Sequence, residues 1–311
     1  MSELRVRILG RDPSGEADSL TPEALAACHP LWADFVGSPR DWRESPGPGG
    51  QAFFVPRKAG GESVPGDRPA RLTVCGPCSS GFDVAWAMVR AGDFFPFDSV
   101  LVVSQRGGRG QMRREWDSPP GNVYGVVSCP GDLPGPESLL PVFFGYVMAS
   151  RLFSMGVEAF FKWPNDVVVR GKKVGGVLLE ERAGRVLAGV GVNLTSAPTS
   201  EKLRREHALP AGTLAEIGLF PGPVRFWADL VKFLQTCYHD CVTATCSFPP
   251  VTRMEQRLAF LGRNVLVREG GKDVYAARVL GLAEDGGLRL MRREDGRNRE
   301  CVIHSGGITL L

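Results

Sequence analysis

Short apolar runs and longer helical patterns follow one another along most of the chain. Arg71–Val74 and Ser99–Ser104 are apolar runs of strand length, which predict buried strands. Between them, the apolar residues of Phe82–Ala91 are spaced to cover one broad face of a helix. The same patterns predict a strand at Asn122–Ser128 and helices at Glu137–Met155 and Val224–Val242. Strands and helices are mixed, which predicts an α+β fold.

Residues 160–193 predict an antiparallel meander. Strand-like segments at Asp166–Val169, Val174–Glu181 and Arg185–Asn193 are separated by turns at Arg170–Lys173 and Ala183–Gly184. Residues 257–311 continue with short strands and turns but carry no helical pattern. Strands without helices over this length predict a small barrel of the SH3 type.

Residues 1–70 predict little regular structure. One helix fits near Thr21–Phe35, and Gly37–Pro69 is rich in proline and glycine. A DNA-reading helix-turn-helix needs two or three packed helices. We therefore expect no specific binding of nucleic acid by this segment.

Composition and charge narrow the classes of function further. The 37 Lys and Arg residues exceed the 34 Asp and Glu residues by only three, which excludes the broad basic surface of a dedicated nucleic-acid binder. The best candidate for a membrane span contains Arg151 and Glu158, and the start lacks the apolar stretch of a secretory signal. We expect a cytoplasmic protein that does not insert into membranes and binds anions only locally.

Two groups of cysteines are candidates for reactive or metal-binding sites. Cys75-Gly-Pro-Cys78 has the spacing of a redox pair between a strand and a helix, but a turn with small buried thiols is the favoured interpretation. The second group lies on one predicted helix and does not converge on a tetrahedral centre, which predicts no protein zinc site. Its members are Cys237, His239, Cys241 and Cys246.

The segment from Gln105 to Trp116 is the first candidate for chemistry. It follows a predicted strand, reads QRGGRGQMRREW, and has a local charge of +3 from four arginines and one glutamate. Its glycines allow the backbone to approach an anion, and its arginines can pair with phosphate or carboxylate oxygens. A solvated basic hairpin tip is the alternative.

Two further segments carry candidate polar groups. Lys162-Trp-Pro-Asn-Asp166 places a lysine before a rigid turn, where it can neutralise charge on a phosphate, although the same residues also suit an ordinary strand-initiating turn. In Gly189-Val-Gly-Val-Asn193, alternate glycines are expected to leave open space on one face of a strand, with the Asn193 amide directed into it. A bulged strand is the alternative there.

Taken in order, these motifs resemble those of biotin protein ligases over roughly residues 70–311. The resemblance rests on GGRGQMRREW, on KWPNDVVVRGKKVGGVLLEE, on GVGVN and on the predicted C-terminal barrel. It implies a mixed or antiparallel-sheet catalytic domain of the biotin/lipoate ligase type at residues 71–256. A small SH3-like barrel would follow at residues 257–311, and residues 1–70 would be an N-terminal extension of unknown role.

The resemblance also implies roles for individual residues. Lys162 and Arg109 would be catalytic. Biotin and its adenylate would be bound by Ser79, Ser80, Gln105, Gly108, Arg109, Gly110, Gln111, Trp116, Lys162, Gly175 and Gly176. The nucleotide side would be formed by Arg113, Arg114, Asn165, Asp166 and Asn193, with Mg²⁺ at Asp166 and Asn193.

Two positions depart from the family pattern. The Ser-Thr-Asn motif that contacts biotin corresponds to Ser80-Gly81-Phe82 or, in another register, to Ser79-Ser80-Gly81, and either register loses a hydroxyl or an amide. The second arginine of the loop is replaced by Gln111, which removes a fixed charge.

The activity implied by the resemblance is ATP-dependent. Biotin would be activated as biotinyl-5′-AMP and transferred to a lysine of a biotin carboxyl carrier protein, with ATP and Mg²⁺ as cofactors. The alternatives are a lipoate or octanoate-type ligase and a weakened, non-catalytic biotin-binding homologue. A homodimer through a sheet edge stays open, because edge strands cannot be identified from one sequence.

Overall fold

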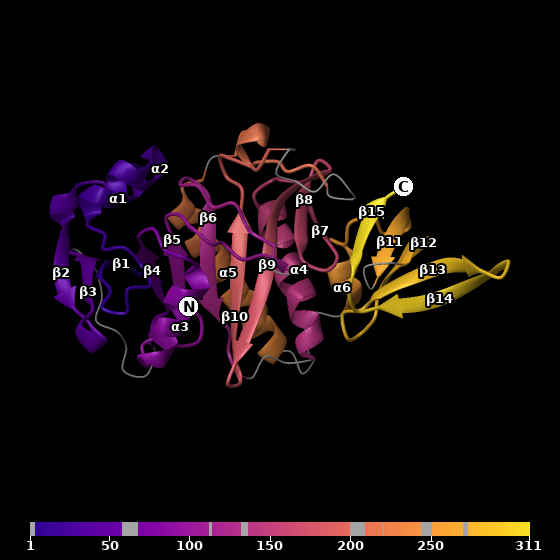
Figure 1. Cartoon of the computed structure of the whole chain (residues 1–311), viewed down its shortest axis with the longest axis horizontal. Helices are drawn as coiled ribbons and strands as arrows, with labels where there is room; N and C mark the ends of the chain where they lie inside the picture. The colour runs from indigo at the N-terminus through magenta and orange to yellow at the C-terminus, as the bar shows by residue number, and fades with distance from the viewer. Residues whose placement is uncertain are drawn as a thin grey trace. The chain divides into compact units, whose positions relative to one another are not determined.

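The computed structural model describes residues 4–57, 68–111, 114–131, 136–199, 209–219, 221–243, 251–269 and 273–311. The chain forms two compact units, of which the first comprises residues 1–132, 178–196 and 213–232. The second comprises residues 133–177, 197–212 and 233–311. Strand β9 (Lys172–Arg182) and helix α5 (Pro223–Thr243) pass from one unit into the other (Figure 1).

The first unit is built on a mixed sheet. Its strands run in the order β2-β3-β1-β4-β5-β6-β10, with β1, β4 and β5 parallel and the other pairs antiparallel. The strands are β1 (Arg5–Arg11), β2 (Trp42–Pro46), β3 (Ala52–Pro56), β4 (Arg71–Cys75), β5 (Ser99–Val102), β6 (Val123–Ser128) and β10 (Arg185–Val192). Helix α3 (Gly81–Arg90) packs against β5, β6 and β10, and its apolar face forms much of the core of this unit.

The N-terminal segment differs from the sequence expectation. Two short helices, α1 (Pro22–Cys28) and α2 (Pro30–Val36), replace the single predicted helix. The break lies at His29, whose φ of −171° and ψ of 147° are extended, as a following proline favours. Strand β1 pairs with β4, and Ile8 lies in the core, which therefore begins well before residue 70. The domain boundaries at residues 70 and 256 stay predictions.

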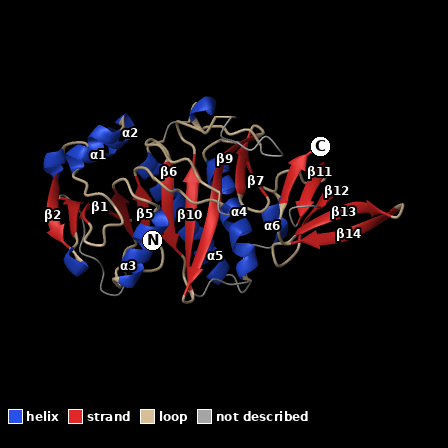
Figure 2. Ribbon diagram, in the orientation of Figure 1, coloured by secondary structure: helices blue, strands red, loops and turns tan. Residues whose placement is uncertain are grey.

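The second unit contains the predicted long helix and part of the predicted meander. Helix α4 (Leu140–Ser154), drawn in blue in Figure 2, lies against β7 (Ala159–Lys162), and it also contacts β8 (Asp166–Val169). Strand β8 pairs antiparallel with both β7 and β9. A short helix, α6 (Val251–Glu255), precedes the C-terminal sheet.

Five antiparallel strands follow in the order β14-β13-β12-β11-β15. They are β11 (Asn264–Glu269), β12 (Asp273–Leu282), β13 (Leu288–Glu294), β14 (Arg297–Ile303) and β15 (Gly307–Leu310), drawn in orange to yellow in Figure 1. Short 3₁₀ turns lie at Pro39–Asp41, Pro48–Gly50, Glu137–Leu139 and Ala215–Ile217. The mixed sheet and the small antiparallel C-terminal sheet confirm the predicted α+β fold class. Among the described residues, no helix is both long and apolar enough to cross a bilayer.

Candidate functional site

The arginine-rich segment of the first unit is a hairpin. The Trp116 amide donates to the Gly108 carbonyl at 2.8 Å, and the Gly110 amide donates to the Arg114 carbonyl at 2.8 Å. A side chain at Gly108 would collide with the Trp116 carbonyl, which explains the glycine. Gln111 lies next to the tip, whereas Arg113 lies outside the described residues.

The start of α3 is tied to this hairpin by Gln105. Its Oε1 accepts from the Gly81 amide at 2.9 Å, and its Nε2 donates to Ser118 Oγ at 2.9 Å. The Gly107 amide donates to the Ser79 carbonyl at 2.9 Å. Ser80 is 1% exposed, and its hydroxyl has no hydrogen-bond partner among the described residues. A buried hydroxyl left in this way is unfavourable until another group satisfies it.

Arg109 is paired with two carboxylates. Its Nη2 lies 2.8 Å from Asp83 Oδ1, and its Nε lies 3.2 Å from Glu180 Oε1. Glu180 also accepts from Trp86 Nε1 at 2.9 Å and pairs with Arg182 at 3.0 Å. Two arginines thus face two carboxylates. We refer to Arg109, Arg182, Asp83 and Glu180 as the arginine cluster. Sequence reasoning did not assign a role to either carboxylate.

The glycines of β10 do not leave the open face that the sequence predicted. A Cβ atom at Gly189 would lie 2.5 Å from the Phe82 ring, and one at Gly191 would lie 2.6 Å from the Trp116 ring. Aromatic side chains therefore fill the space that the missing Cβ atoms provide. Asn193, at the end of this segment, is 3% exposed, and its backbone carbonyl accepts from the Leu214 amide at 3.0 Å.

A second charged group lies in the second unit. Lys162 Nζ lies 3.2 Å from Asp166 Oδ2, and Lys173 Nζ forms an ion pair with Asp166 Oδ1. Burial alone would raise the pKa of Asp166, but Lys173 and Lys162 outweigh it and hold this pKa below its ordinary value. We refer to these three residues as the lysine cluster. Two ammonium groups share one carboxylate, which leaves a net charge of +1.

Lys162 is more buried than a lysine at a strand entrance is expected to be. Its side chain is 9% exposed, whereas that of Lys173 is 31% exposed. Lys162 is tolerated inside because it lies directly opposite Asp166 in the β7–β8 ladder. Lys173 was not among the predicted site residues, although it ends the basic turn Arg170–Lys173. Only the pairing of β8 with β9 brings it to Asp166.

The remaining residues of the KWPND turn fix its shape. Asn165 Nδ2 donates to the Val177 carbonyl at 2.6 Å, and Trp163 Nε1 donates to the Gly286 carbonyl at 3.0 Å. On β9, Gly175 lies opposite Val167 and Gly176 lies opposite Asp166. The structure thus groups Lys162, Asn165, Asp166, Gly175 and Gly176 in the second unit. In the first unit lie Ser79, Ser80, Gln105, Gly108, Arg109, Gly110, Gln111, Arg114, Trp116 and Asn193. Their roles stay predictions.

The donor set at Asp166 does not fit a magnesium ion. Mg²⁺ prefers carboxylate oxygens and water, but each oxygen of Asp166 is engaged by a lysine ammonium group. Within the described ranges, no group of three or more His, Cys, Asp or Glu side chains is placed to hold a metal ion.

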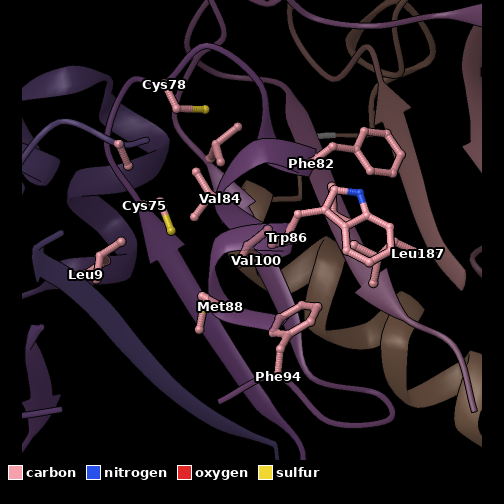
Figure 3. Packing of buried hydrophobic residues seen from close by; sticks show 14 of the residues in the cluster. Leu9, Cys75, Cys78, Phe82, Val84, Trp86, Met88, Phe94, Val100 and Leu187 are labelled. Carbon is pink, nitrogen blue, oxygen red and sulfur yellow. The ribbon is translucent and has the colours of Figure 1, made fainter. Parts of the chain in front are cut away.

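The thiols of the Cys75-Gly-Pro-Cys78 segment lie in the core of the first unit. Figure 3 shows both side chains among the apolar residues between β4 and α3. Burial raises the pKa of Cys78 to about 12 and raises that of Cys75 as well. A thiol that stays protonated is a poor nucleophile, and the two cysteines serve as small core residues.

Comparison with known proteins agrees with this architecture. Residues 97–195 match the Biotin/lipoate A/B protein ligase family. The structure of biotin protein ligase from Aquifex aeolicus, solved with biotin and ATP, aligns with a TM-score of 0.64 and 20% identity over 77% of this chain and 99% of that one. At this identity the likeness shows the fold.

Relatives of known activity are similar over much of the chain. The biotin–[acetyl-CoA-carboxylase] ligase of Paracoccus denitrificans is 29% identical over 211 residues, which cover 64% of this chain and 85% of that protein. The bifunctional ligase/repressor of Escherichia coli is 28% identical over 67% of this chain and 65% of its own length. The chain thus spans slightly less than two thirds of that relative. These matches show that the chain is similar to biotin ligases over about two thirds of its length. They also confirm the resemblance to a biotin protein ligase.

Proposed function

We propose that this protein is an ATP-dependent ligase that joins biotin to a lysine of a biotin carboxyl carrier domain. In the first step the biotin carboxylate attacks the α-phosphorus of ATP, which forms biotinyl-5′-AMP and releases pyrophosphate. In the second, the lysine amine attacks the biotinyl carbonyl carbon, loses a proton and displaces AMP. Both steps develop negative charge on oxygen. The observation that carries the proposal is the lysine cluster, which presents excess positive charge.

The lysine cluster would act on oxygens of the reacting carboxylate and the α-phosphate. Lys173 has the more exposed side chain, and the more buried Lys162 pairs with the other oxygen of the same carboxylate. Asp166 holds both ammonium groups, which keeps them oriented before the substrate arrives. Fixed charges of this kind stabilise a phosphoryl-transfer transition state because they need no reorganisation during the reaction.

The hairpin of the first unit would hold the acyl adenylate. Its glycines bring backbone amides close to the ligand, and Arg109 would exchange a carboxylate partner for an oxygen of the adenylate. The buried Ser80 hydroxyl would pair with a polar atom of biotin. Closure of the hairpin would exclude water from the mixed anhydride, which water would otherwise hydrolyse.

Magnesium would enter with the nucleotide rather than occupy a prepared site at Asp166. This follows from the ion pairs that both oxygens of Asp166 make. In the lysine cluster, Lys162 and Lys173 would supply positive charge, and Asp166 would position them. The cytoplasm supplies ATP and carrier proteins, and we place the reaction there.

Residues 4–57 contribute β1, β2 and β3 to the sheet of the first unit, and their two helices, α1 and α2, are only seven residues each, which supports a protein without specific duplex DNA binding. A homodimer stays a prediction.

The test is biotin-dependent exchange of labelled pyrophosphate into ATP, followed by transfer to a carrier domain. We expect exchange with biotin, little with lipoate, and labelling of the carrier only when its acceptor lysine is present. A carrier with that lysine replaced by arginine is the matched control. Exchange that depends on lipoate rather than biotin would favour the lipoate-type alternative. Absence of exchange with either acid would contradict the ligase proposal.

A further inference from the structure

Phe82 lies in the first turn of α3 and fills a space on β10. Its side chain is 4% exposed, and two atoms of its ring would lie 2.5 Å from a Cβ at Gly189. Figure 3 shows Phe82 and Trp86 projecting from the same side of this helix. A glycine inside a strand weakens the strand, and it is typical of places where another group approaches the backbone closely. Here that group is the phenyl ring.

The ring belongs to the apolar core of the first unit, and two polar groups lie close to it in sequence or in space. Ser80, two residues earlier, carries the buried hydroxyl without a partner among the described residues. The guanidinium carbon of Arg109 lies 5.4 Å from the centroid of the Phe82 ring. A small-molecule pocket combines apolar walls with a few such convergent polar groups. A buried hydroxyl without a partner two residues before the ring, and a guanidinium beside the ring, are polar groups that a ligand in the place of the ring could use.

The space over Gly191, the neighbouring glycine of β10, is filled by a residue of the hairpin. Gly191 lies on the same face of β10, since residues two apart in a strand share a face, and Trp116 packs over it. Trp116 belongs to the hairpin, whose backbone is held to Gly108. Phe82, by contrast, is not part of the hairpin, and a change of its side-chain rotamer would free the space over Gly189. A ligand can therefore occupy the space over Gly189 without unfolding the hairpin, whereas it cannot occupy the space over Gly191 in this way.

We propose that Phe82 is a specificity-determining residue, whose ring competes with the acyl substrate for the space over Gly189. This inference rests on the proposed function. The substrate class is a carboxylic acid with a compact ring system that carries a polar group for Ser80. A pocket closed by a side chain binds with reduced affinity, because only the fraction of molecules with the ring displaced is competent. Phe82 therefore weakens binding and restricts the acids that fit.

The experiment measures biotin and lipoate affinity without ATP, by calorimetry, for the full chain and for Phe82→Ala. We expect the variant to bind biotin about tenfold more tightly, because the competent state no longer has to be selected. Phe94→Ala is the matched control, since Phe94 is 2% exposed in the same core cluster and is not among the atoms closest to Gly189. It should lose stability without a gain in biotin affinity. Phe82→Leu, which keeps an apolar side chain, serves if Phe82→Ala folds poorly, and it should also gain affinity.

Substitution of the glycine gives an independent readout. In the wild-type background, Gly189→Ala should lower the melting temperature because the new methyl group collides with the ring. In the Phe82→Ala background the same change should be tolerated in stability, yet it should weaken biotin binding about fivefold because it fills the vacated space. Unchanged biotin affinity in the double variant would show that the ligand does not lie over Gly189 and would overturn the inference.

The outcomes separate this inference from the proposed function. Equal or weaker biotin binding by Phe82→Ala and Phe82→Leu, with wild-type binding intact, would overturn only the role of Phe82. Tight binding of lipoate but not of biotin by the Phe82 variants would contradict the proposed substrate while supporting Phe82 as the selector. If no variant binds either acid, both proposals fall.

Discussion

The lysine cluster and the arginine cluster differ in how many carboxylates balance their positive charges. In the lysine cluster, one carboxylate serves two ammonium groups, and the lysine and aspartate side chains are between 9% and 31% exposed. In the arginine cluster, two carboxylates serve two guanidinium groups, and Arg182 is 49% exposed. The first has a net charge of +1 and the second is neutral.

This difference bears on how each cluster would meet an anion. The lysine cluster can accept a phosphate or carboxylate oxygen without giving up its existing ion pairs. The arginine cluster can do so only if Arg109 exchanges Asp83 or Glu180 for the ligand. The lysine cluster is therefore preorganised for charge stabilisation, whereas the arginine cluster is suited to binding that accompanies a rearrangement.

The largest expected effect comes from removing a lysine. Lys173→Ala and Lys162→Ala should each reduce pyrophosphate exchange by about two orders of magnitude, because loss of one charge stabiliser at a reacting oxygen has effects of that size. Arg170→Gln is the control, since Arg170 is an exposed basic residue in the turn between β8 and β9. Exchange above about a tenth of the wild-type rate in either variant would remove that lysine from its assigned role.

The next effect comes from the carboxylate between the lysines. Asp166→Asn should lower the free energy of unfolding by about 3 kcal/mol at pH 7, because it removes the charged partner of the buried Lys162 ammonium group and one ion pair of Lys173. The pKa of Asp166 is lowered in the folded chain, so its contribution to stability is present above its ordinary pKa and is lost as the pH falls below about 4. Urea unfolding should therefore show the difference between variant and wild type narrowing below that pH.

The same variant separates a positioning role from a metal-binding role. We expect the magnesium concentration that gives half-maximal exchange to stay unchanged in Asp166→Asn, while the rate falls. A large rise in that concentration would instead show that Asp166 holds the metal ion during the reaction.

A smaller effect is expected when the arginine cluster loses one of its carboxylates. Asp83→Asn should slow the dissociation of preformed biotinyl-adenylate about threefold, because Arg109 then has less to give up when it binds the ligand. Part-exposed ion pairs are worth about 1 kcal/mol or less, which limits the effect. Asp18→Asn is the matched control, since Asp18 pairs with the exposed Arg106 in the same hairpin. A faster dissociation from Asp83→Asn would mean that Asp83 orients Arg109 rather than competing for it.

The smallest effect concerns the missing loop charge. Gln111→Arg should slow adenylate dissociation by about twofold, because a charge-assisted hydrogen bond is stronger than a neutral one. Arg114 lies nearby in the hairpin and is exposed. An unchanged or faster rate would indicate that Arg114 already supplies the charge at that place.

Local patterns were sufficient for many elements of the fold. The strands at Asp166–Val169 and Lys172–Arg182 and the helix at Leu140–Ser154 lie close to their predicted bounds, and the C-terminal region is built of short strands, as predicted. Period-2 and period-3.6 patterns and turn residues act over a few positions, and they can be recognised without knowledge of the rest of the chain. The sequence motifs were also sufficient to name the family that the comparisons support.

The tertiary structure decided the features that depend on distant residues. β1, β2 and β3 were not predicted, because their place in the sheet comes from pairing with one another and with β4 rather than from a local pattern. The pairing of β8 with β9 brings Lys173 to Asp166, and the packing of α3 on β10 places Phe82 over Gly189. The sequence alone can identify a basic turn or a glycine-rich strand as a candidate functional segment. The ion pair of Lys173 with Asp166 and the packing of Phe82 over Gly189 form only when segments far apart in the chain come into van der Waals contact.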